Sequence, residues 1–263
     1  MFLLAVLNHF FEKIVDFTLV PATSISDHKR VLEMLQPFDN GIELIRLGAA
    51  TDGGYLLPND LAGIGLCISP GVANNWEFET DLLNRFGIHS LMLDGSIEPP
   101  DLAKGMNFRK VWLAPSNSEN QVSLNTLIEE FADQVNVDLV LQMDIEGDEY
   151  LTLISTDKQN LSKFRIMVIE FHSIEMWRVN SYFSMVVSPL FERLLEDFYV
   201  VHIHPNNGGL DFDWHGKRYP SGLEVTFHRR DRSTLIVGPR TIPNNLDHRC
   251  DSSRPESIFP LEI

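Results

Sequence analysis

From residue 64 onward, short runs rich in large apolar residues alternate with segments of helical periodicity, and this alternation limits the possible folds more than any other feature. The apolar runs are GIGLCISP, HSLMLDGS, RKVWLAP, VDLVLQMDI, FRIMVIEFH and YVVHIHP. Helical patterns separate them, as in the spacing of Leu124, Leu127, Ile128 and Phe131. Strands that are apolar on both faces and alternate with helices are typical of a parallel sheet covered on both sides. The sequence therefore predicts an α/β fold.

The alternation ends after residue 204. The stretch NNGGLDFDWHGKRYPSG, residues 206–222, contains no crossover helix and is predicted to be a turn-rich connection, and LEVTFHRR follows it as a further strand. A connection of this kind permits antiparallel pairing. We therefore expect a seven-stranded, mostly parallel sheet with an antiparallel C-terminal hairpin. Before this hairpin, residues 182–198 are predicted to form a helix that starts afresh or kinks at Pro189.

The chain shows no internal repeat and no long linker, which favours one domain with additions at both ends. We expect an N-terminal helical extension over residues 1–45, a central α/β domain over residues 46–238, and an irregular C-terminal arm over residues 239–263. The arm is predicted from its four prolines and its many polar residues.

Charge and cysteine usage narrow the possible partners. The formal net charge is -16, which repels phosphate backbones and argues against nucleic-acid binding. The two cysteines, Cys67 and Cys250, lie far apart and do not form a CxxC pair, so neither a zinc knuckle nor a disulfide framework is indicated. We expect a reducing, cytoplasmic location and no metal.

The first residues are apolar, but polar and charged residues from Asn8 onward interrupt the run before the roughly 20 residues that a membrane span needs. A basic start and a small-residue cleavage site, the marks of a secretory signal, are missing. The segment 2–14 can instead form a helix with one broad apolar face. Packing on the domain or on a second copy of the chain is favoured, and the second case would give a homo-oligomer through this helix. Weak contact with a membrane surface is the alternative.

In an open α/β sheet the ligand lies beyond the carboxyl ends of the strands, so the first two strand ends are candidate binding positions. Ser69 and Gly71 form a turn onto a helix that begins near Trp76. One glycine stands where a dinucleotide fingerprint has three, which favours a smaller nucleoside ligand. Asp94 ends the second strand 23 residues after Gly71, near the interval at which an acid accepts hydrogen bonds from ribose hydroxyls. An exposed turn aspartate is the alternative.

The fourth predicted strand runs into the acidic sequence DIEGDE, residues 144–149. Asp148 and Glu149 can be explained by the positive end of the helix that follows. Asp144 and Glu146 are two residues apart at a strand end, so both side chains can face one pocket, where they can hold a cation, a metal or a proton.

Histidines follow the next two predicted strands. His172 comes after the fifth strand, together with Glu170, and His204 comes after the sixth. If these strand ends are neighbours, either histidine can be a general base near neutral pH. The same histidines with Asp144 or Glu146 can alternatively form a metal site.

Several segments together resemble one known family. The most specific is DIEGDEYLTL, residues 144–153, preceded by SLNTLIEEF and VDLVLQM. Upstream lie RLGAATDGGYLLPNDL and SPGVANNWEFETDLL, and downstream lie VIEFH, HIHPNN and LEVTFHRRD. These segments, spread over residues 46–231, resemble the FkbM-type S-adenosylmethionine-dependent methyltransferases, in particular a branch with DGGY and HPNN segments. The chain departs from the wider family at Ser69-Pro70-Gly71, where a glycine-rich loop is usual.

The resemblance implies a Rossmann-like class I methyltransferase fold, S-adenosylmethionine as the cofactor, and O-methylation of a sugar or small-molecule hydroxyl. The residues expected to contact the cofactor are Ser69, Gly71, Trp76, Glu77, Asp94, Gly95, Asp144 and Glu146. Removal of the acceptor proton is expected from Asp144, His172 or His204. The alternatives are a metalloenzyme that uses Asp144, Glu146, His172 and His204, a non-catalytic nucleoside-binding protein, and a dinucleotide oxidoreductase.

Overall fold

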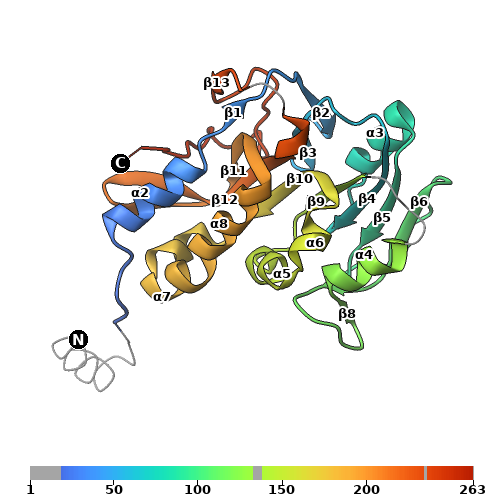
Figure 1. The fold of residues 1–263 in the computed structure, drawn as a ribbon, viewed down its shortest axis with the longest axis horizontal. Helices are drawn as coiled ribbons and strands as arrows, with labels where there is room; N and C mark the ends of the chain where they lie inside the picture. Colours follow the sequence, from blue (N-terminus) through green and yellow to red (C-terminus); the bar gives the residue numbers. More distant parts are fainter. Residues whose placement is uncertain (1–18, 133–137, 234–235, 263) are drawn as a thin grey trace.

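The strands of the central domain form one seven-stranded sheet with the order β11-β12-β10-β9-β4-β5-β6, seen in the computed structural model of the chain (Figure 1). The structure describes residues 19–132, 138–233 and 236–262. The strands of this sheet are β4 (Ile64–Pro70), β5 (His89–Leu93), β6 (Met106–Arg109), β9 (Asp138–Met143), β10 (Phe164–Phe171), β11 (Phe198–Trp214) and β12 (Lys217–Arg229). β12 runs antiparallel to both of its neighbours, β10 and β11, while the other neighbouring strands of this sheet pair in parallel. This confirms the predicted α/β class and its antiparallel C-terminal hairpin.

Two apolar clusters cover the two faces of the sheet. One face packs against α4 (Leu124–Ala132), α5 (Glu149–Ser155) and α8 (Ser188–Asp197). The other packs against α3 (Glu77–Phe86) and the hairpin of β2 (Leu44–Gly48) and β3 (Gly54–Pro58). Alternate residues of one strand face opposite clusters: Ile68 belongs to the first and Cys67 to the second. Both faces are therefore buried, as the continuous apolar strands predict.

The remaining elements connect or flank these layers. They are α2 (Ile25–Met34), β1 (Phe38–Asp39), β7 (Trp112–Leu113), β8 (Gln121–Val122), α6 (Lys158–Leu161), η1 (Ile174–Arg178), α7 (Asn180–Tyr182), η2 (Phe183–Val187), η3 (Arg230–Arg232) and β13 (Gly238–Pro239). The π-helical turn η2 directly precedes α8, and Pro189 lies in the first turn of α8. The helical backbone runs on without a break from η2 into α8, because Val187 and Ser188 both have αR dihedrals. The helix expected over residues 182–198 is therefore present, and its irregularity is a π-helical turn just before Pro189 rather than a new start at that residue.

The stretch 206–222 is not the turn-rich connection that we expected. β11 and β12 continue through it and are joined by a tight turn at His215 and Gly216, whose φ angles are 49° and 76°. Within this stretch the pairing is irregular between Asn206 and Asp211, around a Gly-Gly pair that conceals the strand pattern in the sequence. The extended hairpin is stabilised by aromatic contacts, and its Trp214 ring stacks on His28 of α2 at 3.4 Å between ring centroids.

The third predicted strand is also corrected. RKVWLAP, residues 109–115, was expected to form one strand, but the sheet strand β6 ends at Arg109. Trp112 and Leu113 instead pair with β8 in a separate two-stranded sheet. The apolar run therefore spans two elements with different partners.

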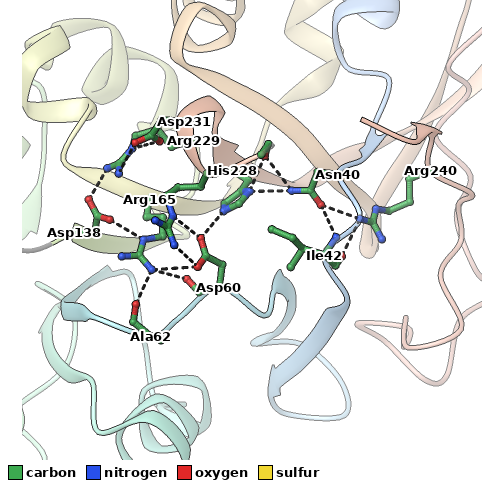
Figure 2. Close-up of polar contacts among 12 residues, drawn as sticks. Asn40, Ile42, Asp60, Ala62, Asp138, Arg165, His228, Arg229, Asp231 and Arg240 are labelled. Carbon is green, nitrogen blue, oxygen red and sulfur yellow. Dashed lines mark hydrogen bonds and ion pairs between the residues drawn. The ribbon is translucent and has the colours of Figure 1, made fainter. Parts of the chain in front are cut away.

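A network of charged side chains joins the strands at the edge opposite their carboxyl ends (Figure 2). Arg165 contacts Asp138 at 2.7 Å and Asp60 at 3.3 Å. Asp60 also binds Arg232 and His228, while Arg229 binds Asp138. Arg165 is almost completely buried, so this network holds β9, β10 and β12 together away from the candidate site.

The structure describes most of the C-terminal arm but not the first 18 residues of the chain. The predicted apolar helix over residues 2–14 lies outside the described residues, so its role in oligomerisation stays a prediction. The C-terminal arm is largely irregular but places Phe259 in the main core, against Trp177 and Tyr219. Across the described ranges, the helices all lack the length and apolar character needed to cross a membrane.

Candidate functional site

Gly71 begins the candidate site at the carboxyl end of β4. Its φ is +86°, and a Cβ added to it would lie 1.5 Å from the backbone oxygen of Asp144. The Gly71 N–H donates to Leu93 O at 2.8 Å, and the Asp144 N–H donates to Pro70 O at 3.2 Å. The ends of β4, β5 and β9 therefore pack backbone against backbone, and only glycine fits at this turn.

Asp94 connects the first turn to the end of β5. Its carboxylate accepts hydrogen bonds from Ala73 N at 2.8 Å, from Ser96 N at 2.7 Å and from Ser96 Oγ at 2.6 Å. The indole of Trp112 covers the next residue, Gly95, because a Cβ there would lie 2.3 Å from the indole ring. Asp94 thus holds the turn that a nucleoside would approach. Its carboxylate already accepts three of about four possible hydrogen bonds, which leaves one lone pair, on Oδ2, for a ligand.

Ser69 does not face the exterior of the site. Its fully buried hydroxyl contacts Glu79 Oε1 and Gln142 Oε1, and Gln142 Nε2 donates to Tyr55 Oη at 3.2 Å. Burial raises the pKa of Glu79 to about 7. A protonated Glu79 can donate to Ser69 Oγ, which then donates to Gln142, so every hydroxyl proton has an acceptor. Ser69 is therefore a structural neighbour of Glu79.

Two cavities open at this edge of the sheet. The first, here called the β4 cavity, has a volume of about 80 Å³, and its lining includes Gly71, Asn75, Phe78, Glu79, Gln142 and Asp144. The second, here called the β10 cavity, has a volume of about 300 Å³, and its lining includes Glu146, Glu170, His172, Asn206, Cys250 and Asp251. Asp52 lines both cavities, which are therefore adjacent.

The loop that carries Asp52 is the tip of the β2–β3 hairpin and contains the DGGY segment. Arg46 donates to the backbone oxygens of Ala49 and Thr51, and Asn75 donates to Asp52 O at 3.2 Å. A Cβ on Gly54 would lie 1.8 Å from Ala49 O, so this position requires glycine. The hairpin tip is thus held against the turn after β4 and forms one wall of both cavities.

His172 lies among four carboxylates. Its Nδ1 is 3.0 Å from Glu149 Oε1, while its Nε2 is 3.5 Å from Glu170 Oε1, 3.6 Å from Glu146 Oε2 and 3.7 Å from Asp144 Oδ1. Glu149 Oε1 also accepts the N–H groups of Ile145 and Gly147. We call Asp144, Glu146, Glu149, Glu170 and His172 the His172 cluster. Among its members, the structure brings together Asp144, Glu146 and His172 as expected for one pocket.

Burial and mutual repulsion perturb the charges of the His172 cluster. Burial raises the pKa of Asp144 and of Glu170, and their mutual repulsion adds to the rise for Glu170. For His172, burial opposes the charged form, but the hydrogen bond to Glu149 and the surrounding carboxylates outweigh it and raise the pKa. Perturbed pKa values in several adjacent groups are typical of functional sites, including those that bind cations or transfer protons.

His204 does not join His172, contrary to our expectation. β10 and β11 are not neighbours, because β12 lies between them and places Glu224 between the two histidine positions. His204 is buried, with Nδ1 3.3 Å from Glu224 and Nε2 3.1 Å from Glu256, and it is not among the described residues that line the β10 cavity. His204 therefore contacts Glu224 and Glu256 rather than the cavity, and its expected catalytic role stays a prediction.

Two further expected contacts lie outside both cavities. Glu77 is exposed on α3, and Trp76 is half-buried against the small cluster around Val72. The residues of the same segment that line the β4 cavity are Phe78 and Glu79. The helical period explains the difference, since residues two apart on a helix point in different directions. Three residues that line the cavities were not expected from the sequence: Asp52, Glu79 and Gln142. Asp52 lies in the DGGY segment and Glu79 in the WEFE segment, so both segments carried a signal.

The strand order, its single antiparallel strand and the site at the carboxyl edge define a class I methyltransferase architecture. The sequence model described as Methyltransferase FkbM domain matches residues 115–198, a segment that includes DIEGDEYLTL, β10 and His172. The match covers the segment with the most specific motif and confirms the family resemblance over these residues.

Comparison with solved structures gives several distant matches. A Streptococcus pneumoniae protein, Sp1610, assigned provisionally as a tRNA (m1A22) methyltransferase, matches at 12% identity and TM-score 0.36, over 65% of this chain and 66% of that chain. The METTL16 methyltransferase domain matches at 8% identity and TM-score 0.31, over 86% and 94%. The antibiotic-resistance methyltransferase Kmr matches at 11% identity and TM-score 0.31, over 71% and 100%. Likeness at this level says nothing about the substrate of this chain. Curated protein sequences give no match.

Proposed function

We propose that the protein is an S-adenosylmethionine-dependent methyltransferase that methylates a hydroxyl group of a sugar or another small molecule. The observation that carries this proposal is the adjacency of the β4 and β10 cavities, which share Asp52 at the carboxyl edge of the sheet. Methyl transfer requires a cofactor and an acceptor to be held side by side, and two adjacent cavities supply this arrangement.

The residues of the β4 cavity fit one end of the cofactor. Glu79 Oε2 is buried and, within the described part of the chain, has no hydrogen-bond partner, so it can accept from the amino group of the methionine moiety. Gly71 allows close approach to the turn, and Asp94 with Gly95 lies where the ribose would follow. When bound, S-adenosylmethionine supplies a methyl group activated by the positive sulfur.

Acceptor binding is assigned to the β10 cavity. Asp144 Oδ1 is buried and lacks a hydrogen-bond partner among the described residues, and it lies 3.7 Å from His172 Nε2. These two atoms lie where the cavities meet, since Asp144 lines the β4 cavity and His172 lines the β10 cavity. We assign His172 to orienting the acceptor hydroxyl and Asp144 to receiving its proton.

The charge of the cavity favours an uncharged or cationic acceptor. The described lining of the β10 cavity contains four carboxylate residues and neither lysine nor arginine: Asp52, Glu146, Glu170 and Asp251 are the acids. Together with the net charge of -16, this lining would repel the phosphates of a nucleic acid. A glycan or another small molecule is therefore the proposed acceptor class.

Calorimetry with S-adenosylhomocysteine tests cofactor use, with NAD as the control ligand. We expect saturable binding by the wild-type protein and a loss of at least tenfold in Asp94→Ala. Asp101→Asn, an exposed loop substitution, is the matched control. Absence of S-adenosylhomocysteine binding by the folded wild-type protein would overturn the proposal, and unchanged affinity in Asp94→Ala would remove Asp94 from the site.

Transfer of a radiolabelled methyl group tests the acceptor class. Panels of hydroxylated natural products and sugars are compared with transfer RNA and ribosomal RNA at the same cofactor concentration. We expect labelled small molecules whose label survives mild base, as an ether does, and unlabelled RNA. Labelling of RNA alone would contradict the proposed acceptor.

A further inference from the structure

The His172 cluster contains a gap of the size that a metal ion occupies. Three carboxylate oxygens surround His172 Nε2 at 3.5, 3.6 and 3.7 Å, each beyond ordinary hydrogen-bond length. Two ligand atoms each about 2.1 Å from one ion lie about 3.0 to 3.6 Å apart for angles from octahedral to trigonal. The observed spacing is therefore close to that of ligands around a shared cation.

Two carboxylates beside this gap each have a buried oxygen without a hydrogen-bond partner. Glu170 is only 2% exposed and lines the β10 cavity; its Oε1, the oxygen near His172 Nε2, accepts from Asn206 Nδ2, while its Oε2 has no hydrogen-bond partner in the described ranges. The Oδ1 atom of Asp144 is likewise buried without a hydrogen-bond partner among the described residues, and it lies 3.7 Å from His172 Nε2. A buried carboxylate oxygen that makes no hydrogen bond is costly, and a bound cation would satisfy it.

Glu149 presents His172 in the manner of a metal ligand. Its carboxylate takes the Nδ1 side of the ring at 3.0 Å and is itself held by two backbone N–H groups. A histidine whose Nδ1–H is held by a carboxylate directs the Nε2 lone pair outward, and metal-binding histidines are commonly oriented in this way.

We propose that a divalent metal ion binds at His172 Nε2 between the carboxylates of Asp144 and Glu170. Glu146, whose side chain is 85% exposed, supplies a further oxygen from the solvent side. One imidazole with several carboxylates is an oxygen-rich set that suits Mn²⁺ and related divalent ions. The role of the ion rests on the proposed function: it would bind the acceptor hydroxyl oxygen beside the cofactor and ease loss of its proton.

The neighbouring group His204, Glu224 and Cys250 is a useful contrast. Its potential ligand atoms lie within 4.8 Å of one another, as do those of Asp144, Glu149 and His172. However, both nitrogens of His204 are bound to carboxylates, and the Cys250 thiol donates to Glu224 at 3.2 Å. Burial and the nearby carboxylates raise the pKa of that thiol well above its ordinary value. The hydrogen-bonding groups of His204 and Cys250 therefore already have partners, so we assign the ion to His172.

Titration of the full-length, chelator-treated protein with Mn²⁺, followed by the electron paramagnetic resonance signal of the free ion, tests the site. We expect one bound Mn²⁺ per chain and affinity at least about tenfold weaker in His172→Gln and in Glu146→Gln. Glu146 is exposed, so its variant keeps the fold even if a buried substitution does not. His89→Gln and Asp101→Asn, both at exposed positions, are the matched controls and should bind as the wild type does.

Three results would overturn the metal site: no saturable binding, binding that both variants retain, or nitrogen NMR that shows Nε2 of His172 still protonated with excess Zn²⁺. Calorimetry with S-adenosylhomocysteine on the same metal-free and metal-loaded samples separates the two proposals. Cofactor binding without metal binding would contradict only the proposed metal site. Metal binding without cofactor binding would contradict only the proposed methyltransferase function.

Discussion

Glu149 Oε1 lies 3.0 Å from His172 Nδ1, and this contact couples the acidic loop after β9 to the end of β10. The same oxygen accepts the N–H groups of Ile145 and Gly147, so one fully buried carboxylate shapes the loop and orients the imidazole. Sequence alone suggested that Glu149 serves the helix that follows it; in the structure it is a positioning residue of the candidate site.

Glu149→Gln should therefore lower the pKa of His172, because the substitution removes the carboxylate that favours the charged imidazole. We expect a stability loss of about 1–3 kcal/mol from the weakened buried contacts. Histidine titration by NMR and urea unfolding measure the two effects. Glu175→Gln, within η1 and away from the β9 loop, is the control; an unshifted His172 titration in Glu149→Gln would contradict this role.

Glu79→Gln should change how stability depends on pH. Burial raises the pKa of Glu79 from 4.5 to about 7, so between these values the folded state holds a proton that the unfolded state has lost. The contribution of Glu79 to stability is therefore complete below pH 4.5 and declines as pH rises to about 7. At pH 8 the variant should be more stable than the wild type by up to about 3 kcal/mol. Urea unfolding of both proteins from pH 4 to 8 checks this, and a difference that does not vary with pH would refute it.

Arg165→Met should destabilise the fold without weakening cofactor binding. The substitution leaves Asp60 and Asp138 partly buried without their shared partner, at a cost of about 3–5 kcal/mol. Lys110→Met removes an exposed pair with Glu98 and should cost about 1 kcal/mol or less. Urea unfolding measures both. Because the network lies at the opposite edge of the sheet, a large loss of S-adenosylhomocysteine affinity in folded Arg165→Met would show that the two edges are coupled.

Gly71→Ala should disrupt the site, since its new Cβ would fall 1.5 Å from Asp144 O and must displace backbone. Gly216→Ala is the matched control: its φ is also positive, at +76°, but nothing lies within 4 Å of the added atom. The control should lose only about 1–2 kcal/mol, the ordinary penalty for a left-handed residue. Thermal unfolding and S-adenosylhomocysteine calorimetry distinguish the variants, and equal behaviour of the two would show that close packing at Gly71 is unimportant.

The order of strands and helices was predictable from the sequence because burial on both faces imposes a continuous apolar pattern on each strand. The antiparallel last strand was predictable from the missing crossover helix. The extension of β11 and β12 was not, because the Gly208-Gly209 pair interrupts the alternation, and the extended hairpin is stabilised by tertiary contacts such as the stacking of Trp214 on His28.

The sequence by itself determined the fold class and the edge of the sheet at which polar residues collect, since both follow from local periodicity and from where each strand ends. Only the tertiary structure decided which of these residues meet. The insertion of β12 between β10 and β11 separates His204 from His172, and the turn of α3 selects Glu79 over Glu77. Side-chain proximity depends on strand order and helix rotation, which are set by packing between segments distant in the chain.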